Sequence, residues 1–197
     1  MKVFAAAAAL AIVLAGCFPT LYPLFTEQDL VFEKDLLGCW TIEESMWTFE
    51  HKSDKTYLLT IVEKEDGQTF KGDFAAHLVK LDGKLFLDIT PADLNKINTP
   101  DISKICLYPM HLFMKVDEIS PELKISLMEP EWLEEYLKEN PEKLPFVPKD
   151  KNRPLPLITA STSQLQTLVK ENADNVEAWT KPAAMTRCGD KPDKASK

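Results

Sequence analysis

The stretch LLGCWTIEESMWTF, residues 36–49, indicates the fold class of this 197-residue chain. Trp40, Ile42 and Met46 share one phase of a two-residue period, while polar residues occupy the other phase. Successive side chains of a strand point to opposite faces, so this pattern is typical of a strand with one buried face. We therefore expect one first strand from Leu36 to Phe49, at the start of a β-rich domain.

Consecutive hairpins are expected to follow this strand. Asp66-Gly67 and Asp82-Gly83 separate segments rich in apolar and β-branched residues, and such pairs favour tight hairpin turns. A polar loop at 91–102 interrupts the series and is long enough to cover or gate one end of a sheet. The strands that we expect are 57–64, 69–80, 84–90, 105–119 and 123–128.

The C-terminal half predicts two helices. Pro130 suits a first helical turn, and an apolar stripe follows it until Asn140-Pro141. Ser161 and Gln164 have the spacing of a capping box at the start of a second helix. A last strand at 184–188 would close the sheet. The expected fold is mainly β (α+β), an antiparallel meander sheet with two helices in the C-terminal half.

A short motif lies inside the opening stretch. Gly38, one further residue and Trp40 resemble the glycine-x-tryptophan signature of lipocalin-like barrels. In that family the tryptophan plugs one end of the barrel, so the resemblance implies a lipocalin-like barrel as the form that the sheet takes. A core tryptophan in another kind of β domain is the alternative.

The first residues predict export and anchoring. Lys2 precedes an apolar run from Val3 to Leu14, which is too short to span a bilayer but has the length of a secretory signal core. The run leads into Leu14-Ala15-Gly16-Cys17, which resembles the lipobox of bacterial lipoproteins. That resemblance implies removal of residues 1–16 and acylation of Cys17 with palmitate-like chains, several of which hold a protein stably on a membrane. An ordinary cleaved signal is the alternative.

The resemblance also implies an address and a domain plan. Residue 18 is phenylalanine rather than a retaining aspartate, and lipoprotein sorting in Gram-negative bacteria then implies the outer membrane, facing the periplasm. Residues 17–35 would form the lipid anchor and a tether that packs in part on the body, 36–188 a single β-rich domain, and 189–197 a disordered tail.

Longer stretches are similar to a group of small β-rich bacterial envelope lipoproteins with no assigned activity. The similarity supports the fold and the address, and it transfers no catalytic residue. The stretches are LYPLF (21–25), LLGCW (36–40), FAAHLVKLDGKLFLDI (74–89) and LITASTSQLQ (157–166).

Charge and motifs argue against several functions. The formal net charge of −8 argues against a nucleic-acid partner, because phosphate backbones repel an acidic surface. His51, His77 and His111 are isolated, and the chain lacks the common hydrolase, zinc-protease, phosphate-loop and dinucleotide motifs. We expect no enzyme activity, no cofactor and no metal. A metal or acid–base pair of His77 and His111 is the alternative.

The cysteines predict one disulfide. With Cys17 acylated, three cysteines remain in an oxidising compartment. Cys39 and Cys188 adjoin the first and last strands, which are neighbours if the sheet closes, so we expect these two to pair. Cys106 would be a buried free thiol. The alternative is that all three are reduced.

Two functions remain open. In the first, the barrel binds a hydrophobic small molecule or a lipid in an apolar cavity. In the second, a solid body anchored to the membrane acts as a scaffold or binds an envelope protein partner. Barrels of about eight strands support both functions. The expected cavity residues are Trp40, Met46, Phe74, Leu112 and Met114.

Overall fold

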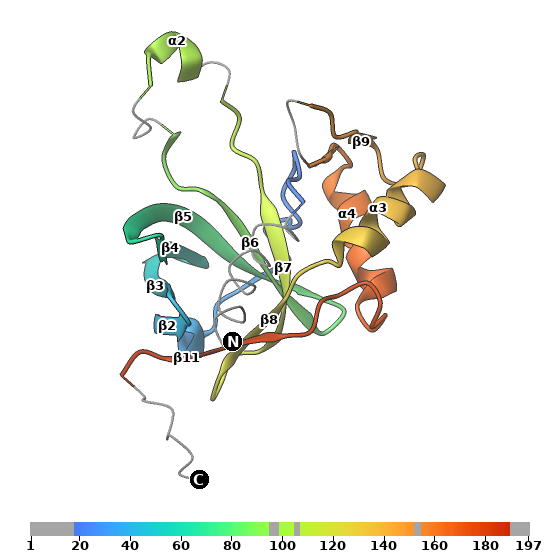
Figure 1. Ribbon diagram of the computed structural model, residues 1–197. Coiled ribbons are helices and arrows are strands. Elements are labelled where there is room, and N and C mark those ends of the chain that lie inside the picture. Colours follow the sequence, from blue (N-terminus) through green and yellow to red (C-terminus); the bar gives the residue numbers. More distant parts are fainter. Residues whose placement is uncertain (1–17, 95–98, 105–106, 152–154, 190–197) are drawn as a thin grey trace, which may run out of the picture.

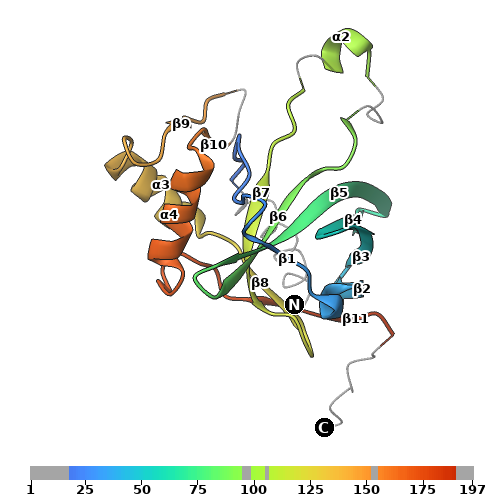
Figure 2. The same cartoon turned by 180° about the vertical axis from the view of Figure 1, so that it is seen from behind.

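A closed antiparallel barrel of eight strands forms the body of the protein, and two helices pack against its outside (Figures 1 and 2). The structure is a computed structural model that describes residues 18–94, 99–104, 107–151 and 155–189. The signal at 1–16, Cys17 and all but Gly189 of the expected tail lie outside these ranges. No helix in the described ranges has the length and apolar character needed to cross a membrane.

The first seven barrel strands follow one another in chain order, each paired with the next, and the eighth lies between the seventh and the first and closes the barrel. Lipocalin barrels also have eight up-and-down strands, so the structure is compatible with that resemblance. The expected mainly β class, in its closed form, is confirmed. The strands are β2 (Gly38–Ile42), β3 (Ser45–Ser53), β4 (Thr56–Glu65), β5 (Gln68–Leu81), β6 (Lys84–Pro91), β7 (Leu112–Glu118), β8 (Leu123–Ser126) and β11 (Ala183–Arg187).

The expected first strand, 36–49, is in fact two strands. The chain turns at Glu43-Glu44, where Glu43 adopts a φ of 50°, and β3 runs back along β2. Trp40 therefore lies opposite Trp47 on the interior face of the barrel. The prediction of one continuous strand was wrong because neither glutamate is a usual residue for a tight turn.

The other predicted hairpins form as the sequence indicates. Asp66-Gly67 joins β4 to β5, and Asp82-Gly83 joins β5 to β6. All four residues have positive φ values, from 47° to 82°. Two consecutive positive φ angles match the twist of the flanking strands, and glycine adopts such an angle without steric cost.

Apolar side chains form two separate cores, one inside the barrel and one outside it. The inner core contains large side chains from all eight barrel strands, among them Trp40, Trp47, Tyr57 and Met114. The outer core lies between the barrel and helices α3 (Pro130–Glu139) and α4 (Thr162–Asn172). Each face of the barrel wall in this region is thus covered by apolar contacts.

Both helices start as predicted. Pro130 occupies the first turn of α3. At α4, the Ser161 hydroxyl accepts from the backbone N–H of Gln164, and the Gln164 side chain accepts from the backbone N–H of Ser161 at 2.9 Å. This capping box satisfies two backbone donors that the helix itself leaves unpaired.

Residues 18–35, expected to be a tether, belong to the folded domain. Phe18 and Leu24 are buried in the outer core. Strand β1 (Leu30–Val31) pairs with β5, and the short helix η1 (Lys34–Leu36) follows. The remaining short elements are α2 (Asp101–Lys104), β9 (Phe146–Val147) and β10 (Leu157–Ile158).

Candidate functional site

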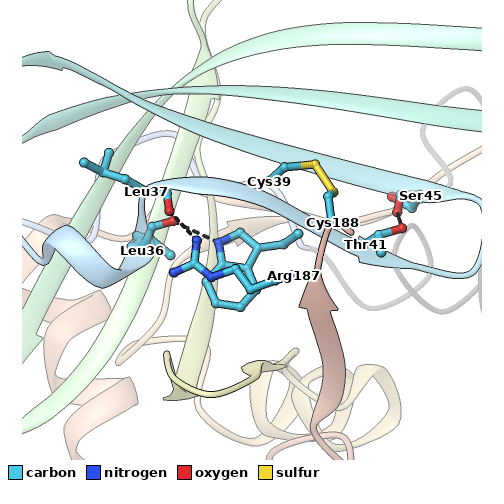
Figure 3. The surroundings of a disulfide bond; sticks show 8 residues. Leu36, Leu37, Cys39, Thr41, Ser45, Arg187 and Cys188 are labelled. Carbon is cyan, nitrogen blue, oxygen red and sulfur yellow. Dashed lines mark hydrogen bonds between the residues drawn. A yellow bond between two sulfur atoms is a disulfide. The ribbon is translucent and has the colours of Figure 1, made fainter. Parts of the chain in front are cut away.

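One end of the barrel is closed by Trp40. Its indole N–H donates to the carbonyl of Leu36 at 2.9 Å, and the Arg187 guanidinium carbon lies 3.8 Å from the centre of its ring. Arg187 also donates to the backbone carbonyl of Leu37 (Figure 3) and to that of Asp35. A cation over an aromatic face is attractive, and here it joins the last barrel strand to the first, while the hydrogen bonds join it to the segment before the first.

A disulfide lies at the same closed end. It joins Cys39 to Cys188, the pair that we expected, with their Cα atoms 5.3 Å apart (Figure 3). The bridge spans 149 residues of sequence. In the chain-entropy account, closing a loop of that length stabilises the folded state by roughly 3–5 kcal/mol. Cys106 lies outside the described residues.

The opposite end, which we call the mouth, exposes apolar side chains of the interior face. These side chains are half-buried, whereas the interior residues deeper in the same strands are fully or almost fully buried. Four strands thus contribute to one apolar rim, which we call the mouth residues. They are Ile42 on β2, Ile61 on β4, Phe74 on β5 and Leu112 on β7.

Gly72 determines where the ring of Phe74 lies. Both residues belong to the interior face of β5, and Gly72 is nearer the mouth. A Cβ atom on residue 72 would lie 2.8 Å from the Phe74 ring. The ring therefore leans along the strand toward the mouth, into space that any other residue at 72 would occupy.

The structure brings together only some of the expected cavity residues. Phe74 and Leu112 lie at the mouth, and Met114 lies deeper in the interior with 2% of its surface exposed. Trp40 is interior too, but it closes the far end. The assignment of Met46 to the cavity is corrected: it pairs with Thr41 on the outer face and is 39% exposed, because the turn before β3 reverses the expected phase.

Between β6 and β7, helix α2 stands away from the barrel on the side of the mouth (Figure 1). The expected strand 105–119 is shorter than predicted, since β7 begins only at Leu112. Pro109 has no N–H for a ladder hydrogen bond, and it precedes the strand. Ile102 and Tyr108 of this loop are 74% and 60% exposed.

The N-terminal segment, residues 18–31, is held between the barrel and α4. Thr20 and His111 exchange two backbone hydrogen bonds of 2.9 Å, which attach the segment just before β7. From α4, the Thr162 hydroxyl donates to the carbonyl of Pro23 at 2.8 Å, and the Gln166 amide donates to that of Leu24 at 3.0 Å. The start of the folded domain is therefore fixed beside the mouth end of β7.

A surface pocket of about 400 Å³ lies where this segment meets the start of α4. The capping box already satisfies helix donors there. The pocket is a shallow feature of the outer surface, separate from the barrel interior. Its lining residues are Tyr22, Thr26, Ser161, Thr162, Ser163 and Gln166.

A buried polar cluster lies under the N-terminal segment on the outer face of the barrel. Asp88 is fully buried and accepts from Nδ1 of His111 at 2.7 Å and from the backbone N–H of Leu24 at 2.8 Å. His77 lies opposite Asp88 in the β5–β6 ladder, and the centre of the Phe25 ring is 4.5 Å from that of the His77 ring, with the two planes tilted by 36°.

Burial lowers the pKa of His77, and its Nδ1 is buried without a hydrogen-bond partner. Asp88 raises the pKa of this ring and His111 lowers it further, but burial is the largest cause. The two histidines considered for a metal or acid–base pair thus flank one aspartate. Within the described ranges, no three such side chains are arranged to hold a metal ion.

Sequence reasoning missed Ile42 and Ile61 as mouth residues and Asp88 as the centre of the polar cluster. Ile42 shared the phase of Trp40, so the pattern contained it. Asp88 is a single carboxylate within the apolar run LFLDI, which is the one local signal of a buried charge.

Comparison of the chain with protein families, with curated proteins and with solved structures finds no match.

Proposed function

We propose that this protein is an envelope lipoprotein that binds a hydrophobic small molecule or a lipid at the mouth of its barrel. Cys17 carries the lipid, and the body stands at the periplasmic face of the outer membrane. Binding is non-catalytic in this proposal. The ligand enters at the rim formed by the mouth residues.

The observation that carries this proposal is the apolar rim formed by the mouth residues. Apolar side chains of four strands are only half-buried there, whereas a fully buried tryptophan beside an arginine lies at the other end. Removing apolar surface from water lowers the free energy by about 25 cal/mol per Å². A rim of neighbouring apolar side chains is suited to an apolar ligand.

The start of the chain supports the address. Lys2, the apolar run to Leu14 and the lipobox ending at Cys17 are the features of a bacterial lipoprotein signal. A protein delivered to a lipid surface meets fatty acids and phospholipids there. An apolar mouth is suited to binding such molecules.

A thermal-shift experiment tests the proposal. The mature chain with Cys17→Ser is heated with a panel of fatty acids, phospholipids and sterol-like compounds. A ligand present at a hundredfold its Kd stabilises the folded state by about 2.7 kcal/mol, which is about 5–10 °C for a domain of this size. We expect at least one class of compound to raise the Tm.

Matched variants locate the binding site. Leu112→Gln alters an apolar side chain at the mouth, and Met46→Gln makes the same kind of change on the outer face. We expect Leu112→Gln to reduce the ligand-induced rise in Tm and Met46→Gln to leave it unchanged, each measured against its own ligand-free value. If no compound shifts the Tm and no lipid co-purifies, the binding proposal fails and the protein-partner role becomes the better one.

A further inference from the structure

We propose that the exposed apolar side chains described in the β6–β7 loop, Ile102, Leu107, Tyr108 and Met110, make a second contact with the lipid surface in addition to the proposed acylation at Cys17, and so turn the barrel mouth toward the bilayer. The inference rests on the proposed anchoring at Cys17. It does not require that the mouth binds a ligand.

Exposed apolar side chains concentrate in this loop. The structure exposes eight large hydrophobic side chains in the described ranges, and four of them belong to residues 92–111. Single exposed apolar residues are ordinary on a protein surface, but a local group of them indicates an interaction site. The four are Ile102 (74% exposed), Leu107 (39%), Tyr108 (60%) and Met110 (40%).

The loop begins and ends at the mouth, and the anchor is close to it. Thr20 is hydrogen-bonded through its backbone to His111, the last residue before β7. Cys17 precedes Thr20 by three residues, and three residues extend over at most about 11 Å. Acyl chains on Cys17 would therefore enter the membrane near the base of the loop.

The chemistry of the loop fits a lipid surface. Residues 107–111, LYPMH, include no lysine, arginine, aspartate or glutamate, so their burial requires no desolvation of a permanent charge. Tyr22, 45% exposed, lies on the neighbouring N-terminal segment and adds a second tyrosine to Tyr108. Tyrosine rings are amphipathic and are enriched at membrane–water interfaces.

The net charge of the chain favours an apolar contact with the lipid over an electrostatic one. A protein with a formal charge of −8 is repelled by anionic headgroups, so apolar insertion must provide the attraction. The contact need not be strong by itself. An anchor a few residues away holds the loop at a high effective concentration against the bilayer, so even a weak contact is occupied.

This second contact would fix an orientation. Acyl chains alone leave the body free to rotate about its point of attachment, whereas two contacts leave one face toward the lipid. The rim of mouth residues then opens toward the layer in which apolar molecules are dissolved.

Fluorescence quenching tests the orientation. The lipidated protein is reconstituted in vesicles of phosphatidylethanolamine and phosphatidylglycerol, with or without brominated acyl chains. Tyr108→Trp places a reporter in the loop, and Val176→Trp places one at an exposed position between α4 and β11. Against the unsubstituted protein, we expect the brominated chains to remove the added emission at 108 and to leave that at 176.

A second measurement shows whether the native apolar side chains make the contact. Leu107→Glu combined with Met110→Glu, added to the lipidated Tyr108→Trp protein, should restore most of the emission at 108 in the brominated vesicles, because a charged side chain is costly to bury in lipid. Val176→Glu, the matched control, should leave the quenching unchanged. Equal quenching in both variants would overturn the inference.

The outcomes separate this inference from the proposed function. Vesicle-bound protein with an unquenched residue 108 overturns the lipid contact and shows a loop that is open to a protein partner, while ligand binding, measured without vesicles, is unaffected. Lipidated protein that does not associate with vesicles overturns the anchoring and the lipid contact together.

Discussion

Asp88 carries a carboxylate into the most buried part of the outer barrel face. A buried charge is costly unless it is paired and hydrogen-bonded, and His111 and the N–H of Leu24 provide these contacts. Because Leu24 belongs to the N-terminal segment, this one side chain links that segment to β6. His77, opposite Asp88 on the neighbouring strand, is half-buried.

His77 predicts a loss of stability in mild acid. Burial lowers its folded-state pKa below the usual value of 6.5, so below about pH 6.5 the unfolded chain binds a proton that the folded chain does not. Its contribution to stability is therefore complete above that pH and decreases as the pH falls toward the lowered pKa. The charges of Asp88 and Glu27 raise the pKa of His77, whereas His111 and Lys52 lower it further, and burial remains the largest cause.

We expect His77→Gln to have a flatter dependence of Tm on pH between 7.5 and 5.5 than the unsubstituted protein. His51→Gln is the control, because His51 is exposed on β3. Parallel curves for the protein and His77→Gln would show that this ring does not carry the effect.

At the scale of elements, α4 depends on its first turn. Ser161→Ala removes the hydroxyl that caps the helix, and losses of this kind cost about 0.5–2 kcal/mol. We expect urea unfolding to show that decrease in the free energy of unfolding. Thr167→Ala, an exposed change within the same helix, should be close to neutral, and an equal loss in both variants would contradict a specific capping role.

Elements with a local chemical signal were predictable. The Asp-Gly hairpins and the capping box depend on a few adjacent residues, and the structure contains them where expected. The Glu43-Glu44 turn has no such signal, and the misplacement of Met46 follows from it. The docking of residues 18–31 depends on distant partners such as Asp88 and Gln166, so no local pattern contains it.

For the whole molecule, the proposed address depends on one atom, the sulfur of Cys17. Cys17→Ser removes the acyl acceptor and leaves the described domain unchanged in sequence. We expect this variant to appear in the soluble periplasmic fraction and to incorporate no labelled palmitate. A Cys17→Ser protein that stays with the membrane and still incorporates palmitate would disprove acylation at this position.

The closed barrel was expected from the strand pattern and the glycine-x-tryptophan motif, and the candidate site only in part. Trp40, Phe74, Leu112 and Met114 face the interior as expected. Their division between a closed end and an open mouth was not predictable. It depends on how far each strand extends and on Arg187, which is 147 residues from Trp40 in sequence but rests on its ring.

The position of β11 has a consequence for the order of folding. Until this last strand is in place, β2 and β8 are open edges, each with a row of unpaired backbone groups that other chains can bind. The barrel therefore cannot close on a chain that is still being made or exported, because its final ladder requires residues 183–187. Pairing of β11 with β2 also brings Cys188 to Cys39, so a native disulfide marks molecules in which the chain is present at least as far as Cys188.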